Sequence, residues 1–139
     1  SLKDSKNMVI IGGGYIGLEV AAVSKTLGLN VTVIEMASRI LERVTSPTIS
    51  SFYNSFHESK GVKILTSTSV KGINGDKRVS SVETSSGTID ADIVIVGIGV
   101  LPCQSLAEDS GMAVDNGIIV DVSKRDSIPC FDNFSFVFR

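Results

Sequence analysis

The sequence predicts an α/β domain in which helices pack on a parallel β-sheet and a small antiparallel β-meander replaces one crossover helix. Short apolar runs are typical of the buried strands of a parallel sheet. Helix-compatible segments that end at glycines lie between these runs. Residues 69–90 differ, because Asn-Gly-Asp and Ser-Gly separate short alternating segments there, and these are hairpin and turn signals.

The first predicted unit is a strand, a helix and a second strand. Asn7–Ile11 forms a short buried strand, and residues 14–27 form a helix that ends at Gly28. The β-branched run Asn30–Glu35 forms the next strand, and the crossover should be right-handed. The helix carries a small-residue stripe suited to close packing on the sheet, formed by Gly17, Ala21 and Ser24. Its apolar stripe consists of Ile16, Val20, Val23 and Leu27.

A second helix and a third strand are predicted after a loop. Ser46 can cap this helix, Pro47 can be its first residue, and Gly61 marks its end. Val62–Leu65 then forms a strand. The expected apolar face of the helix consists of Ile49, Phe52 and Phe56, with Tyr53 at its margin.

The remaining elements follow the meander. Asp92–Gly97 returns to a buried parallel strand, residues 104–110 form a short helix, and Gly117–Val122 forms another strand. Because there are no repeats or linkers, the sequence predicts one domain over residues 1–122. Residues 123–139 are a divergent tail with no functional assignment.

The composition is that of an ordinary soluble, cytoplasmic protein. The 139 residues are 42% hydrophobic and carry a formal net charge of −2, and no basic stripe indicates nucleic-acid binding. Neither a signal-peptide core nor a membrane-length apolar run is present. Cys103 and Cys130 are too far apart for a redox pair or a metal cluster, so reduced thiols and no metal site are expected. His57 is the only histidine, and a solvent-edge or packing role is a better expectation for it than catalysis.

A glycine turn points to the chemistry. Gly12, Gly14 and Gly17 fit the G-x-G-x-x-G fingerprint, between a buried strand and a helix. The first glycine permits the tight turn, the second lets a pyrophosphate approach the backbone, and the third lets the helix pack close to the strand. The N–H groups and dipole of the helix then face the phosphates. Glycine clusters also occur in plain turns, and FAD and NAD sites share the fingerprint.

Glu35 adds a preference between cofactors. It lies 23 residues beyond Gly12, at the end of the second predicted strand, near the expected spacing of about 20 residues. Its carboxylate can accept hydrogen bonds from the hydroxyls of the adenosine ribose and would repel a 2′-phosphate. The sequence therefore predicts a Rossmann-like three-layer domain that binds NAD(H) in preference to NADP(H).

Other candidate residues have a structural alternative beside the functional one. Glu19 either complements the helix dipole or meets the nicotinamide amide. Arg39 and Arg43, at helical spacing, lie near the adenosine end or form a solvated basic face. Gly97 and Gly99 follow a strand at the carboxyl edge of the sheet, where close approach to the nicotinamide half is favoured over a mere turn.

Four separated motifs resemble the NADH-binding domain of putidaredoxin reductase-like flavoproteins. They are Gly-Gly-Gly-Tyr-Ile-Gly-Leu-Glu-Val-Ala-Ala (12–22), Leu-Glu-Arg-Val-Thr (41–45), Val-Gly-Ile-Gly-Val-Leu-Pro (96–102) and Val-Asp-Asn-Gly-Ile-Ile-Val-Asp (114–121). The resemblance implies a ferredoxin reductase of the pyridine nucleotide-disulfide oxidoreductase superfamily. In that mechanism NADH passes hydride to FAD in a neighbouring domain, and electrons pass singly to a ferredoxin.

The resemblance also implies residue roles. Glu35 would hold the adenosine ribose, Arg43 would lie at the adenosine end, and Glu19 would sit near the nicotinamide and flavin. The full predicted cofactor-binding set is Gly12, Gly14, Tyr15, Ile16, Gly17, Glu19, Glu35, Arg43, Gly97, Ile98 and Gly99.

Two departures from the family pattern limit the expectation. Cys103 stands where the family has Asn, and the Gly-Asp motif that helps bind FAD does not follow Asp121. We therefore expect this chain alone not to bind FAD. Two alternatives stay open: a non-catalytic nucleotide-binding or interaction module, and a truncated gene product.

Overall fold

The structure is a computed structural model that describes residues 5–125. The chain divides into two compact units, the first ending at Ile98 and the second beginning at Gly99. Much of the predicted tail, including Cys130, lies outside the described residues. Within residues 5–125, no helix is long and apolar enough to cross a membrane.

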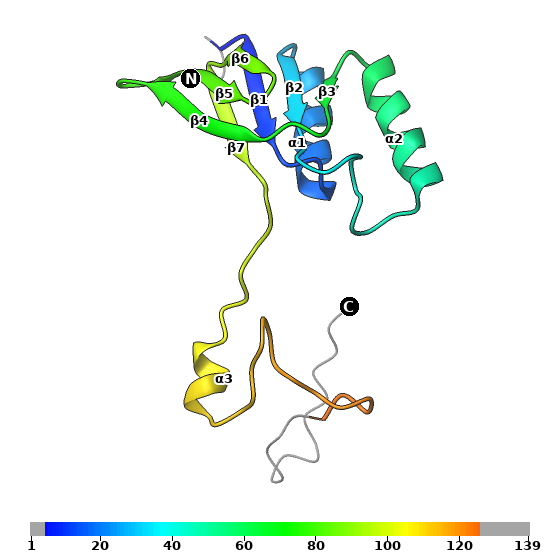
Figure 1. The fold of residues 1–139 in the computed structure, drawn as a ribbon, viewed down its shortest axis with the longest axis vertical. Coiled ribbons are helices and arrows are strands. Elements are labelled where there is room, and N and C mark those ends of the chain that lie inside the picture. The colour runs from blue at the N-terminus through cyan, green and yellow to red at the C-terminus, as the bar shows by residue number, and fades with distance from the viewer. Residues whose placement is uncertain (1–4, 126–139) are drawn as a thin grey trace. The chain divides into compact units, whose positions relative to one another are not determined.

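A four-stranded parallel sheet organises the first unit (Figure 1). Its strands are β1 (Asn7–Ile11), β2 (Asn30–Ile34), β3 (Lys63–Leu65) and β7 (Ile93–Val96). The order across the sheet is β3-β2-β1-β7, and every neighbouring pair is parallel. The predicted parallel sheet is therefore confirmed, with β1 paired on both sides.

Asp92 fixes the start of β7 against the start of β1. Its Oδ2 accepts hydrogen bonds from the backbone N–H groups of Lys6 and Asn7, both at 2.8 Å. These backbone hydrogen bonds lower the pKa of the Asp92 carboxyl, because they stabilise its charged form. This clamp lies at the amino ends of the two strands, opposite the edge where the glycine turn begins.

Helix α1 (Tyr15–Thr26) follows β1 as predicted. The small-residue stripe Gly17, Ala21 and Ser24 is buried, and Gly28 ends the helix region at φ +85°. The apolar stripe, however, is largely exposed in the first unit: Ile16, Val23 and Leu27 are each more than 60% exposed. Small residues allow the helix backbone to approach the sheet closely, and the larger side chains therefore point outward.

A three-stranded antiparallel sheet forms the predicted meander. Its strands are β4 (Val70–Gly75), β5 (Val79–Thr84) and β6 (Gly87–Asp90), in that order. The bend between β4 and β5 spans residues 76–78, and the turn between β5 and β6 spans residues 85–86. The predicted Asn-Gly-Asp and Ser-Gly signals are therefore only in part within these connections, because Asn74 and Gly75 lie in β4 and Gly87 begins β6. The meander leads directly into β7, so it stands where a crossover helix would otherwise be.

The core explains the three layers. Met8 and Ile10 of β1 pack with Ala21 of α1 on one face of the parallel sheet. Val9 and Ile11, which alternate with them along the strand, pack with residues of the meander on the other face, including Val82 and Ile89. The predicted three-layer α/β fold, with a parallel sheet and a small antiparallel meander, is thereby confirmed.

Helix α2 (Pro47–Ser59) begins and ends where the sequence predicted. Ser46 is its N-cap, and the Ser46 hydroxyl accepts a hydrogen bond from the Ile49 N–H at 3.4 Å. The apolar face of this helix is exposed within residues 5–125. Ser50 and His57 are the buried residues of the helix, whereas Phe52 is 61% exposed. Ser50 faces inward because its hydroxyl donates to the Ile40 carbonyl at 2.6 Å.

The second unit contains helix α3 (Ser105–Asp109), within the helix predicted over residues 104–110. The strand predicted at Gly117–Val122 is wrong. Instead, Val114 and Ile118 form an isolated antiparallel bridge around a turn in which Asn116 and Gly117 have positive φ. A β-branched run becomes a strand only where another strand pairs with it, and the described part of this unit offers none.

Candidate functional site

Three parallel strands end at one edge of the sheet and place the predicted residues there. Gly12 follows β1, Glu35 follows β2 and Gly97 follows β7. Backbone hydrogen bonds extend the ladder past the strand ends: Gly12 N–H donates to the Ile34 carbonyl and Gly97 N–H to the Ile11 carbonyl, both at 2.8 Å. The carboxyl edge of such a sheet is where ligands bind in open α/β folds.

Gly12 and Gly17 have structural reasons to be glycine. Gly12 has φ +112°, a backbone conformation that disfavours other residues, and a Cβ there would clash with the carbonyl of Gly97. A Cβ on Gly17 would clash with the carbonyl of Gly12. The turn and the first turn of α1 therefore fold tightly onto the strand end.

Gly14 is different, because no contact within residues 5–125 requires it to be glycine. It is the N-cap of α1 with φ −80° and ψ −177°, which any residue can adopt. Apart from its neighbours along the chain, no atom of the described residues lies within 4 Å of an added Cβ. No acidic residue lies in the first turn of α1, and no side chain among residues 5–125 caps that turn. Tyr15 and Ile16, the first residues of the helix, are exposed. Unsatisfied N–H groups at a helix start form a ready anion site.

Glu35 ties the glycine turn to the next loop. Its half-buried carboxylate accepts a hydrogen bond from Gly13 N–H through Oε2 at 2.7 Å and from Ala37 N–H through Oε1 at 2.8 Å. Each carboxylate oxygen has a further lone pair. The group can therefore accept hydroxyl donors while it keeps both backbone contacts.

Residues 36–46, here called the β2–α2 loop, contain no helix, so the expected helical spacing of Arg39 and Arg43 is wrong. The half-buried Arg39 donates to two backbone carbonyls of its own loop, whereas Arg43 is exposed. Leu41 N–H donates to the Gly13 carbonyl at 2.9 Å. This contact joins the loop to the glycine turn, and Leu41, at φ +54°, has a backbone conformation that a regular right-handed helix does not contain.

The remaining predicted residues are less closely joined to the turn. Glu19 is exposed on α1, two residues beyond Gly17. Ile98 is 69% exposed at the end of the first unit, and Gly99, with φ +125°, begins the second unit. The first unit thus brings together the glycine turn, Glu35 and Gly97.

Sequence reasoning missed three backbone groups of the site. They are the N–H groups of Gly13, Ala37 and Leu41, which connect the turn, the carboxylate and the loop. The middle glycine of the Gly-Gly-Gly run was the available signal, since a Cβ on Gly13 would lie 2.8 Å from Ile40 Cγ2. Backbone donors leave no mark in a side-chain pattern.

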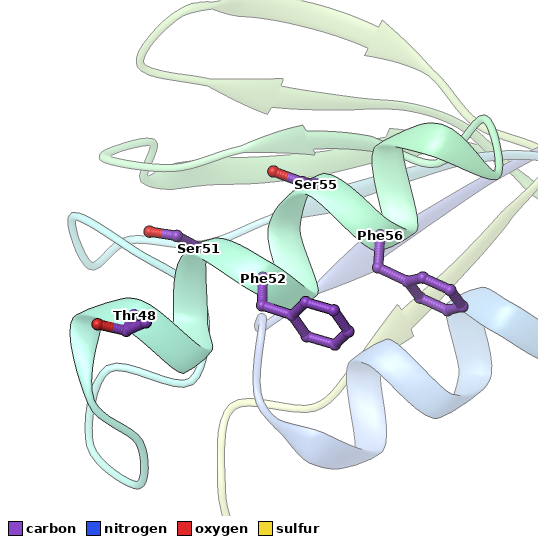
Figure 2. Close-up of a pocket in the computed structure, with 5 residues that line it drawn as sticks. All are labelled: Thr48, Ser51, Phe52, Ser55 and Phe56. Carbon is purple, nitrogen blue, oxygen red and sulfur yellow. The ribbon is translucent and has the colours of Figure 1, made fainter.

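An open surface depression lies elsewhere, on α2. It is lined by Thr48, Ser51, Phe52, Ser55 and Phe56, all from that one helix. Figure 2 shows the two phenyl rings on one side of α2 and the hydroxyls turned to another. Phe52 and Phe56 stack with ring centroids 6.1 Å apart. Within residues 5–125, no group of three acidic, histidine or cysteine side chains could hold a metal ion.

Comparison with known proteins identifies the family and the relatives of this chain. A family model described as pyridine nucleotide-disulphide oxidoreductase matches residues 1–130. Putidaredoxin reductase CamA of Pseudomonas putida is 44% identical over 126 residues, which are 88% of this chain and 30% of that protein. Ferredoxin–NAD(P)(+) reductase fdr of a Sphingomonas species is 48% identical over 124 residues, again 88% of this chain and 30% of that protein.

A solved structure agrees with the sequence comparison. In the covalent putidaredoxin reductase–putidaredoxin complex, a chain 43% identical to this one superposes with a TM-score of 0.82. The match covers 89% of this chain and 31% of that one. The chain therefore spans less than a third of the length of these relatives.

Proposed function

Because this chain belongs to the pyridine nucleotide-disulphide oxidoreductase family, we propose that it binds NADH at the carboxyl edge of its parallel sheet. Gly14 carries the proposal. Its backbone is ordinary and extended, and a Cβ added to it would meet open space. No side chain in the described part of the chain caps this helix N-terminus. No contact within residues 5–125 explains a glycine there, whereas the close approach of a pyrophosphate does.

Glu35 supports NADH as the preferred dinucleotide. Its carboxylate is held in place by Gly13 and Ala37 and keeps lone pairs for the hydroxyls of the adenosine ribose. The 2′-phosphate of NADPH would bring a second negative group to the same carboxylate. Repulsion at this short range disfavours NADPH.

The relatives suggest the reaction that the bound NADH serves. We infer that its nicotinamide lies toward Gly97, Ile98 and Glu19, with Arg43 at the adenosine end. A flavin held outside residues 5–125 would accept the hydride, and a ferredoxin would then be reduced. A hydride carries two electrons, so one NADH reduces two one-electron acceptors. Support comes from the names of the relatives, which are ferredoxin and putidaredoxin reductases.

Calorimetric titration of the 139-residue chain with NADH and with NADPH tests the proposed function. We expect NADH to bind at least about tenfold more tightly than NADPH, which corresponds to about 1.4 kcal/mol. No binding of either nucleotide below millimolar concentration would overturn the proposal. Equal binding of both would remove Glu35 as the basis of selectivity.

A further inference from the structure

We propose that Arg39 is a positioning residue for the dinucleotide, acting through the β2–α2 loop without touching the cofactor. Its guanidinium braces the loop, and the loop holds the Glu35 carboxylate and the Gly13 peptide in their binding geometry. The inference rests on the proposed NADH site. It adds a determinant of NADH-over-NADPH selectivity.

The brace consists of two hydrogen bonds within the loop. Arg39 Nη1 donates to the Thr45 carbonyl at 3.0 Å, and Nη2 donates to the Glu42 carbonyl at 2.9 Å. A guanidinium presents its donors in a rigid, planar fork, and its charge strengthens each hydrogen bond. The side chain therefore ties the middle of the loop to the end that precedes α2.

The Glu42 side chain adds hydrogen bonds back to the first half of the loop. Its Oε2 accepts from the Ser38 hydroxyl at 3.2 Å and from Arg39 N–H at 3.3 Å. Arg39 and Glu42 thus hold each other through backbone groups on both sides. Both of these guanidinium hydrogen bonds go to carbonyl oxygens of the loop itself. We therefore assign Arg39 to support of the loop and not to direct contact with the cofactor.

The braced loop contains a strained residue that needs support. Leu41 has φ +54°, which is uncommon for a leucine, and its side chain is buried in a cluster with Leu18 and Ile40. Such a conformation persists only where surrounding contacts hold it. In this conformation Leu41 N–H reaches the Gly13 carbonyl at 2.9 Å.

The loop connects directly to the carboxylate. Ala37, at the start of the loop, donates its N–H to Glu35 Oε1 at 2.8 Å. Gly13 is held on both polar groups, because its N–H donates to Glu35 Oε2 and its carbonyl accepts from Leu41. Loosening the loop would therefore free the carboxylate and the glycine turn together.

Three substitutions test this role by calorimetric titration with NADH and NADPH. We expect Arg39→Ala to weaken NADH binding about tenfold and to lower the ratio of NADH to NADPH affinity. Arg39→Lys should lose nearly as much, because an ammonium lacks the fork that spans two carbonyls. Arg78→Ala, at an exposed site in the β4–β5 turn, is the matched control and should bind like the wild type. Guanidinium at non-denaturing concentration should partly rescue Arg39→Ala.

The outcomes separate this inference from the proposed function. If the wild-type chain binds no NADH, the proposed function fails. If the wild type binds NADH but the variants keep its selectivity ratio, the positioning role is wrong and the site stands. The positioning role would also be overturned if Arg39→Lys kept the full NADH affinity and selectivity ratio of the wild type. That result would show that a positive charge alone is sufficient at this position. Circular dichroism checks that each variant is folded. If Arg39→Ala is unfolded, the ratio of NADH to NADPH affinity is taken from Arg39→Lys.

Discussion

At the scale of single residues, Glu35 has two tasks that a substitution would remove together. Its oxygens hold the backbone of Gly13 and Ala37, and the same oxygens are proposed to accept the ribose hydroxyls. The carboxylate is therefore positioned before any cofactor arrives. Such preorganisation limits the entropy cost of binding.

Glu35→Ser should weaken NADH binding by about tenfold to a hundredfold, because hydrogen bonds to a charged group are worth roughly 1.5–3 kcal/mol. NADPH binding should fall less, since the repulsion of its 2′-phosphate disappears as well. Competition titrations with the two nucleotides measure the ratio. Glu58→Ser, at an exposed position of α2, is the control. An unchanged ratio in Glu35→Ser would contradict the assignment.

His57 gives a residue-scale prediction about pH. Burial on the inner face of α2 lowers its pKa from the ordinary value of 6.5. As the pH falls through about 6.5, the unfolded chain takes up this proton before the folded chain does. The folded state should therefore be at full stability above this pH and should lose stability below it.

Urea unfolding at pH 7.5 and 5.5 measures this effect. His57 is the only histidine of the chain, so His57→Gln should remove most of the loss of stability between these two pH values. The wild type and the variant would show the same loss if another group were responsible. That result would contradict the assignment to His57.

At the scale of elements, the start of α1 contains one glycine that the fold requires, Gly17, and one that the fold does not require, Gly14. Gly17→Ala should destabilise the fold by about 1–3 kcal/mol, because the new methyl group meets the Gly12 carbonyl. Gly14→Ala should change stability by less than about 0.5 kcal/mol and still weaken NADH binding. Urea unfolding and NADH titration of both variants test this. Wild-type NADH affinity in Gly14→Ala would exclude a close pyrophosphate contact at that residue.

Helix α2 gives a second prediction about elements. Phe52 is 61% exposed, so Phe52→Ser should cost less than about 0.5 kcal/mol of stability. Ile10 is fully buried in β1, so Ile10→Ala should cost about 2–5 kcal/mol. Thermal or urea unfolding compares the two variants. A large loss in Phe52→Ser would show that the aromatic face of α2 is covered in solution.

The elements also show what the sequence could predict. Strands β1 and β7 were predictable because a short apolar run in a parallel sheet carries its own signal. Ser46 and Pro47 likewise located the start of α2 from local capping chemistry. The expected strand at Gly117–Val122 failed because strand formation depends on a distant partner, which a local pattern does not contain.

The candidate site was predictable where local sequence signals locate its residues, and not where contacts between distant residues hold it. Gly12, Glu35 and Gly97 follow strand ends, so the order of elements placed them at one edge. The β2–α2 loop was not predictable, because the backbone contact between Leu41 and Gly13 holds it. Whether the predicted residues bind the cofactor stays a prediction.

At the scale of the whole molecule, the parallel sheet gathers the site from three distant segments. The glycine turn, Glu35 at the end of β2 and Gly97 at the end of β7 come together within the first unit, which ends at Ile98. The chain covers about 30% of the relatives named as reductases, so the hydride acceptor and the ferredoxin are proposals about a larger assembly. NADH binding is the step of the proposed function that can be tested with this chain alone.

The most direct test of that step is an NMR titration of the ¹⁵N-labelled chain with NADH. The proposed site predicts saturable shifts of backbone amide signals at Gly14–Gly17, at Ala37 and at Gly97. Signals on the outer face of α2, such as those of Phe52 and Phe56, should stay unchanged. Shifts centred on α2, or no saturable shift at the glycine turn, would contradict a dinucleotide site at the carboxyl edge of the sheet.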